Sequence, residues 1–133
     1  MIECFCVPFL ARPEFLPARK RLREKLVVME NCSGDLSAFG KADIHFHLAI
    51  IEGSGHQLFG NVMRGLLRGL GVQFARETYI SSELVETKLN EHRAICKALE
   101  LGRGALARQK LRRHLLSSRR HLEQLLRNSD AVR

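Results

Sequence analysis

Apolar residues recur every three or four positions along most of this 133-residue chain, and no stretch alternates apolar and polar residues as a β-strand does. This period predicts helices, and clusters of Gly, Asn, Ser and Asp separate them. We expect five main helices, at residues 17–31, 36–52, 57–79, 81–101 and 105–127. Because the connections are short, successive helices should pack side by side. The chain is therefore predicted to be all-α, an antiparallel bundle of about five to six helices.

The two ends of the chain depart from this pattern. All three prolines lie near the N-terminus, at Pro8, Pro13 and Pro17, and proline interrupts a continuous helix. We therefore divide the chain into an irregular or truncated lead-in at residues 1–13, a helical domain at residues 14–127 and a frayed tail at residues 128–133.

Composition limits the classes of protein to which the chain can belong. Hydrophobic residues make up 45% of it, which is typical of a folded domain rather than a disordered one. The formal net charge of +8 is compatible with anionic partners, from small carboxylates to nucleic acid. Four scattered cysteines without a C-x-x-C pair predict free thiols in a reducing cytoplasm. No apolar run resembles a signal peptide or a membrane span, so we expect a cytoplasmic protein without membrane contact.

One predicted helix carries an acid and a base on its apolar face. Asp43 and His47 are four residues apart, which is about one helical turn, and they share a face with Phe46 and Ile50. His45 points the opposite way. A buried carboxylate and imidazole need partners or a metal. The stretch is therefore either a satisfied ion pair in the core or part of a binding site.

Two further histidines, His92 and His114, lie on the apolar faces of the last two predicted helices. A single inward histidine is usually a hydrogen-bonded core residue, but three of them with an aspartate favour a metal site between helices. Carboxylate and imidazole are ligands that Zn²⁺, Ni²⁺ and Mn²⁺ accept. Four such ligands can close a tetrahedral zinc site, or they can fill part of an octahedron and leave two positions open. The predicted metal ligands are Asp43, His47, His92 and His114.

The predicted helix at residues 57–79 combines a wide apolar face with several glycines and arginines. The wide face predicts a central position in the bundle. Interior glycines weaken a helix, so they indicate close approach of another helix, room for a ligand, or a broken helix around residues 69–71. An arginine that reached the interior would bind a carboxylate through its guanidinium group. The candidate ligand-binding residues are Arg64, Arg68 and Arg76 and, on the last helix, His121.

Several of these residues form an ordered set that resembles a known family. The set is Asp43-x-x-Phe46-His47, Ser54-Gly55, Glu91-His92 and Leu111-x-x-His114-Leu115. It resembles the FCD domain, which is the effector-binding and dimerisation domain of FadR-type GntR transcription regulators, over residues 14–126. The resemblance implies a helical bundle with a central cavity, a small organic acid as effector, and a homodimer. It also implies a divalent metal bound by Asp43, His47, His92 and His114.

The chain departs from the family pattern in three places. His56 follows Ser-Gly where the family usually has Asn, and Arg103 follows Gly102 where the family often has an N-capping Asp. Such regulators also carry a winged-helix DNA-binding domain before the FCD domain, and these 133 residues leave no room for one. The resemblance therefore implies a fragment or a remnant that contacts DNA only through a domain absent from this chain.

Two other functions are alternatives to this one. A metal with open positions activates water in hydrolytic enzymes, but no additional inward Asp or Glu is evident as a general base, so we predict no enzymatic activity. The arginine-rich last helix is compatible with a basic interaction or nucleic-acid-binding module, although such runs usually form a solvated face. The leading hypothesis is a metal-containing domain of a GntR-family regulator, in the FadR subfamily, that senses a small carboxylate and dimerises.

Overall fold

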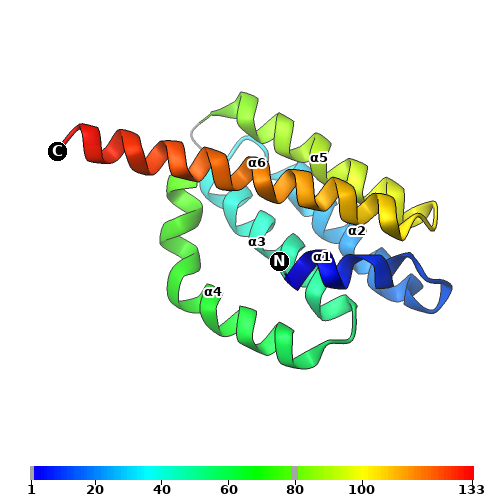
Figure 1. Ribbon diagram of the computed structural model, residues 1–133. Helices are drawn as coiled ribbons and strands as arrows, with labels where there is room; N and C mark the ends of the chain where they lie inside the picture. Colours follow the sequence, from blue (N-terminus) through cyan, green and yellow to red (C-terminus); the bar gives the residue numbers. More distant parts are fainter. Residues whose placement is uncertain (1, 79–80) are drawn as a thin grey trace.

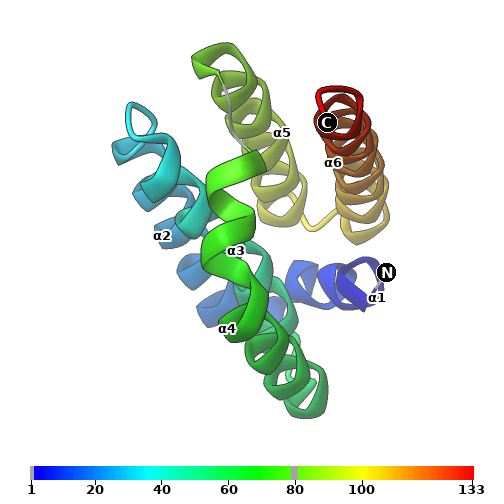
Figure 2. The ribbon, with the colours of Figure 1, turned by 90° about the vertical axis from the view of Figure 1, so that its left-hand side faces the viewer.

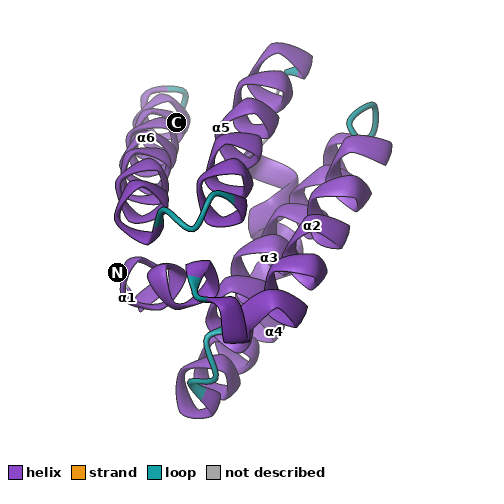
Figure 3. Ribbon diagram, turned by 90° about the vertical axis from the view of Figure 1, so that its right-hand side faces the viewer, coloured by secondary structure: helices purple, strands orange, loops and turns teal. Residues whose placement is uncertain are grey.

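The structure, a computed structural model, describes the backbone at residues 2–78 and 81–133 and the side chains at residues 2–68 and 81–133. All regular structure within these ranges is helical (Figure 3), which confirms the all-α prediction. No helix in the described ranges is long and apolar enough to cross a membrane. The elements are α1 (Ile2–Cys6), the 3₁₀ helices η1 (Val7–Ala11) and η2 (Pro13–Phe15), α2 (Leu16–Asn31), α3 (Leu36–Gly53), α4 (Gln57–Thr78), α5 (Ser82–Glu100) and α6 (Gly104–Ala131).

Local signals in the sequence determine where the helices begin. The Asp35 side chain accepts a hydrogen bond of 3.1 Å from a backbone N–H in the first turn of α3, and Ser81 does the same at 3.2 Å for α5. Helix α6 begins after Arg103 without a side-chain cap. It continues to Ala131, beyond the end predicted at Arg127, and its last turns are exposed.

The N-terminal segment is made of short helices separated where prolines occur. Prolines stand in the first turns of η1, η2 and α2, where the missing N–H removes no helical hydrogen bond. The side chains of Cys6, Val7 and Leu10 are fully buried, and η1 packs against α6, α2, α5 and α3. Residues that the sequence assigned to an irregular lead-in therefore contribute to the core.

The helices pack as two neighbouring pairs with the N-terminal segment against them (Figures 1 and 2). Helix α2 packs against α3, and α5 packs against α6. Helix α2 also contacts α5, which joins the two pairs into one core. The largest fully buried side chains come from the N-terminal segment and from α2, α3, α5 and α6: Leu10, Leu22, Leu26, Met29, Phe39, Phe46, Ile50, Ile51, Leu89, Ile95, Leu99 and Leu111.

Helix α4 does not occupy the central position that its apolar face predicted. It packs against α3 at one side of the molecule, and Figure 1 shows it in green, below the α5–α6 pair. In its described part, Leu58, Val62 and Leu66 are 72%, 50% and 53% exposed. Phe59 and Met63 pack against the core. The prediction was wrong because a wide apolar stripe looks the same in sequence whether the chain's own core covers it or not.

Candidate metal centre

Helix α3 brings the first two predicted ligands together through its own geometry. Asp43 and His47 are one turn apart, and the Asp43 Oδ1 lies 3.3 Å from the His47 Nε2. Both side chains are largely buried, while His45 is exposed on the opposite face as predicted. Phe46 is fully buried, and its ring meets the His92 ring in an edge contact with centroids 4.5 Å apart. The apolar face predicted from the sequence therefore directs the acid and the imidazole toward α5.

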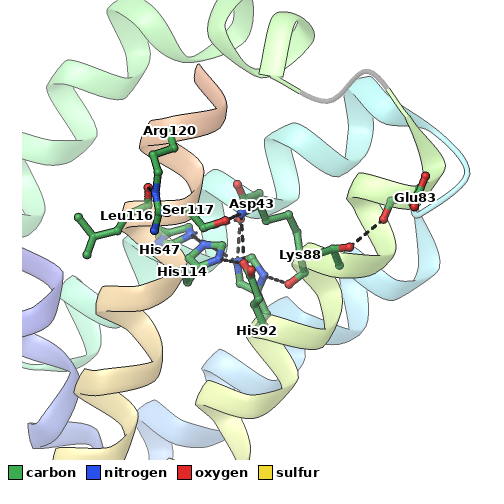
Figure 4. Close-up of polar contacts among 11 residues, drawn as sticks. Asp43, His47, Glu83, Lys88, His92, His114, Leu116, Ser117 and Arg120 are labelled. Atoms are coloured by element: carbon green, nitrogen blue, oxygen red, sulfur yellow. Dashed lines mark hydrogen bonds and ion pairs between the residues drawn. The ribbon is translucent and has the colours of Figure 1, made fainter. Parts of the chain in front are cut away.

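Helices α5 and α6 supply the other two predicted ligands (Figure 4). The His92 Nε2 lies 2.8 Å from the Asp43 Oδ1 and 3.3 Å from the His47 Nε2. The His114 Nε2 lies 3.1 Å from the His47 Nε2. The four side chains offer one ligand atom each, and all four atoms lie within 4.8 Å of one another. Three helices thus bring together the four residues that the sequence predicted as ligands.

The second nitrogen of each imidazole faces an oxygen atom. The His47 Nδ1 contacts the Glu3 carboxylate, the His92 Nδ1 contacts the backbone carbonyl of Lys88 at 2.5 Å, and the His114 Nδ1 contacts the Glu91 carboxylate at 2.5 Å. An oxygen that accepts a hydrogen bond holds the ring proton on Nδ1 and leaves Nε2 directed at the centre. This arrangement of oxygen, imidazole and open Nε2 is the one found around metal-bound histidines.

The contacts among the three imidazoles and the Asp43 carboxylate require a positive charge between them. A neutral imidazole carries one N–H, yet both ring nitrogens of the fully buried His92 face acceptors, the Lys88 carbonyl and the Asp43 carboxylate. The Nε2 atoms of His47 and His114 also face each other. Either protons or a cation must therefore lie among these atoms. Ligands of one divalent metal are about 3 Å apart when the metal–nitrogen bonds are about 2.1 Å, so the observed separations fit a metal.

The pKa shifts of Asp43 and His47 also favour a negative carboxylate and a positive charge in the cluster. Burial raises the pKa of the Asp43 carboxyl, but the charge of His47 and the hydrogen bonds from His47 and His92 outweigh burial and hold that pKa well below its usual range. Burial lowers the pKa of His47, but Glu3 and Asp43 outweigh burial and hold that pKa well above its usual range. Burial and the neighbouring His92 and His47 lower the pKa of His114 to about 4, against the effect of Glu91. A proton on His47 thus carries positive charge that a metal ion can replace.

Three of the four predicted effector-binding residues are not among the side chains of the cluster, and the side chain of the fourth is not described. Arg64 forms an ion pair with Glu52 of α3, and both side chains are partly exposed. Arg68 is exposed on α4, and the side chain of Arg76 lies outside the part of the chain that the structure describes. His121 is half-buried on α6 beyond His114. The role of these four residues in ligand binding stays a prediction.

Sequence reasoning missed the carboxylates behind the ligands. Glu3 and Glu91 face the cluster, so the expectation that no further acid lies close to the four ligands was wrong. Glu91 directly precedes His92 on α5, but its carboxylate contacts His114 on α6. The helical register within α5 does not predict a contact with another helix. Glu3 lies in the segment expected to be irregular, and nothing in its local sequence indicated a role.

A family-model comparison gives a match that covers most of the chain. The sequence model of the family described as the FCD domain matches residues 1–117 of the chain. The search of curated proteins found no matching protein. The matched range contains all four residues of the cluster and also Glu3 and Glu91.

Proposed function

The chain belongs to the FCD domain family, the effector-binding domain of GntR-type transcription regulators, and from this premise we propose a finer function. The domain binds a divalent metal, senses a small carboxylate and dimerises within a regulator of the FadR subfamily. In regulators of this kind, a winged-helix domain binds the DNA. The convergence of three imidazoles and one carboxylate, each imidazole backed by an oxygen, is the observation that carries the proposal.

Asp43, His47, His92 and His114 are the residues that would hold the metal. The chemistry of the donors suits Zn²⁺, Ni²⁺ or Mn²⁺, because imidazole and carboxylate are ligands that all three accept. When bound, the metal supplies a positive charge that a small carboxylate can approach. The chain's own residues fix the three rings and exclude water from one side, because His92 and His114 are buried and Phe46 packs against His92.

The surface of α4 supports the dimerisation part of the proposal. Leu58, Val62 and Leu66 follow one another at four-residue spacing and are at least half exposed. An exposed apolar stripe of this kind is typical of a surface that another protein covers. A second copy of the domain is the partner that the family relation favours.

Metal analysis of purified protein tests the proposal directly. We expect about one Zn²⁺, Ni²⁺ or Mn²⁺ per chain after purification or after supplementation. We also expect Asp43→Ala and His92→Ala to lose the metal, because each removes a donor. His45→Ala is the matched control, since His45 is on the same helix but faces outward. Absence of metal from the supplemented wild-type protein would contradict the metal part.

The effector part needs a separate measurement on the same proteins. A panel of small di- and tricarboxylates should raise the Tm of metal-loaded wild-type protein. The same compounds should leave the Tm of chelator-treated protein and of His92→Ala unchanged. Equal stabilisation with and without metal would show that the carboxylate binds away from the metal.

A further inference from the structure

Glu3 connects the N-terminal segment to the candidate metal centre. Its side chain is 17% exposed, and its carboxylate contacts the His47 Nδ1. Glu3 lies in the first turn of α1, and His47 lies on α3. Figure 1 shows α1 in dark blue beside α3 and below α6, the two helices that carry Asp43, His47 and His114. A contact across 44 positions of sequence thus orients one of the four predicted ligands.

The position of α1 is fixed by contacts on both sides. Next to Glu3, the backbone carbonyl of Cys4 accepts a hydrogen bond of 2.9 Å from the Arg108 Nε of α6. The following residues, Cys6 and Val7, are fully buried in the core. Gly104, at the start of α6, lies so close to Pro8 that an added Cβ would be 3.0 Å from the Pro8 carbonyl oxygen. The carboxylate of Glu3 is therefore held in place by packing, not by its own short helix.

The three imidazoles differ in where their supporting oxygen comes from. The His92 ring is supported by the carbonyl of Lys88, one turn earlier on the same helix. The His114 ring is supported by Glu91 of the neighbouring helix α5. The His47 ring is supported by Glu3, from a segment that precedes the bundle in sequence. Removal of this support would leave α5 and α6 unaltered and would free the His47 ring to rotate.

We propose that Glu3 is a positioning residue for His47, and that metal binding at the cluster further stabilises the packed N-terminal segment, residues 2–11. The inference rests on the proposed function, because it requires a cation among the four ligands. The cation draws electron density from the His47 ring and strengthens the Nδ1–H bond to Glu3. Strengthening that bond stabilises the segment that carries Glu3, because binding and local order are linked.

Competition titration with a chromophoric zinc chelator tests the positioning role. We expect Glu3→Ala to weaken Zn²⁺ binding by about 10- to 100-fold, the usual effect of removing a partner of a metal-bound histidine. Glu3→Gln keeps an oxygen acceptor in a side chain of the same shape, so it should lose less zinc affinity than Glu3→Ala. Glu14→Gln is the matched control, because it removes the same charge from an exposed position shortly after that segment, in η2. Zinc affinity of Glu3→Ala equal to that of the wild-type protein would overturn the proposal.

Hydrogen exchange tests the coupling to the N-terminal segment. In the wild-type protein and in Glu14→Gln, zinc should slow exchange of the amides in residues 2–11 severalfold. Exchange in the buried part of α5, residues 95–99, serves as the internal reference. In Glu3→Ala at saturating zinc, the slowing at residues 2–11 should disappear. Equal slowing in Glu3→Ala and the wild-type protein would overturn the coupling.

A ring-nitrogen spectrum separates positioning from a general loss of stability. In the zinc-loaded wild-type protein, long-range ¹H–¹⁵N spectra should show the His47 proton fixed on Nδ1. In Glu3→Ala, zinc at Nε2 still keeps the proton on Nδ1, but without its acceptor we expect the His47 Nδ1–H signal to broaden by exchange with solvent, while the His92 and His114 signals stay sharp. If Glu3→Ala does not fold, Glu3→Gln is used for all three measurements, and unchanged affinity, exchange and spectra in that variant overturn the proposal. A wild-type protein that binds no zinc contradicts the proposed function itself, whereas wild-type binding with no effect at Glu3 contradicts this inference alone.

Discussion

A buried lysine extends the hydrogen-bonded system away from the candidate metal centre. The side chain of Lys88 is almost fully buried, and its Nζ donates to the Glu91 Oε2 and to the Ser117 Oγ, each at 3.2 Å. The same Glu91 oxygen faces the His114 Nδ1. Burial raises the pKa of Glu91, but His114 and Lys88 outweigh burial, so that pKa is lowered. Lys88 thus helps to keep Glu91 ionised behind His114.

Replacement of Lys88 by methionine should therefore destabilise the domain. Lys88→Met keeps most of the side-chain volume but removes the two hydrogen bonds, one of them to a charged group. We expect a loss of roughly 1–3 kcal/mol in the free energy of unfolding. Lys97→Met is the matched control on the exposed side of α5 and should change the free energy of unfolding by less than about 0.5 kcal/mol. Urea unfolding of the metal-free proteins provides the measurement, and equal stability of the two variants would contradict this account.

At the level of the helices, the glycines of α4 and α6 differ in whether the surrounding structure leaves room for a side chain. A Cβ added at Gly65 in α4 would meet no atom within 4 Å, so close helix packing in this chain does not explain that glycine. A Cβ at Gly60 would lie 3.3 Å from the Glu52 Cγ of α3, and a Cβ at Gly104 would lie 3.0 Å from the Pro8 carbonyl oxygen. Close approach to the rest of the chain, which the sequence suggested for the glycines of α4, applies at Gly60 and not at Gly65.

Two glycine-to-alanine substitutions should accordingly change stability in opposite directions. Gly65→Ala should raise the free energy of unfolding by about 0.5–1 kcal/mol, because alanine restricts the unfolded chain and favours the helix. Gly104→Ala should lower it by about 1–3 kcal/mol, since the new methyl group overlaps backbone that cannot move freely. Thermal unfolding of dilute protein measures both changes. A destabilised Gly65→Ala variant would indicate that α4 packs closely against something other than its own chain.

At the scale of the whole molecule, the bundle buries its core but leaves one helix half covered. Helix α4 contacts α3 and turns Leu58, Val62 and Leu66 to the outside. The arginine-rich face of α6 is also exposed, as the sequence predicted: Arg108, Arg112, Arg119, Arg120 and Arg127. The molecule therefore presents an apolar surface on one helix and a basic surface on another. The apolar surface is the one that supports dimerisation.

A single charge on α4 should disrupt the proposed dimer. Val62→Glu places a carboxylate in the middle of the apolar stripe, and its desolvation in an interface is unfavourable. Light scattering at micromolar concentration should give the mass of two chains for the wild-type protein and of one chain for Val62→Glu. Val28→Glu is the matched control, because Val28 on α2 is 52% exposed against 50% for Val62. A wild-type mass equal to one chain at high concentration would contradict dimerisation.

Features that depend on a single helix could be predicted from the amino-acid sequence. The 3.6-residue period placed Asp43 and His47 on the buried face of α3 and His45 on the outside, because register along a helix is a local property. The structure adds side-chain caps at Asp35 and Ser81, and these are local as well, since a capping side chain binds its own first turn. The ordered motifs also pointed to the FCD family, which the family match confirmed.

Which atoms meet between helices became known from the three-dimensional packing. The supports of His47 and His114 come from Glu3 and Glu91, which lie on other elements, and periodicity within one helix carries no information about such partners. The exposure of Val62 could not be predicted from the sequence either. An apolar helix face has the same residue pattern whether it packs on the chain's own core or is exposed for contact with another protein. The four candidate ligands and their shared site were therefore predictable from the sequence, whereas the distances between their atoms and the identity of the supporting oxygens required the packing of distant segments.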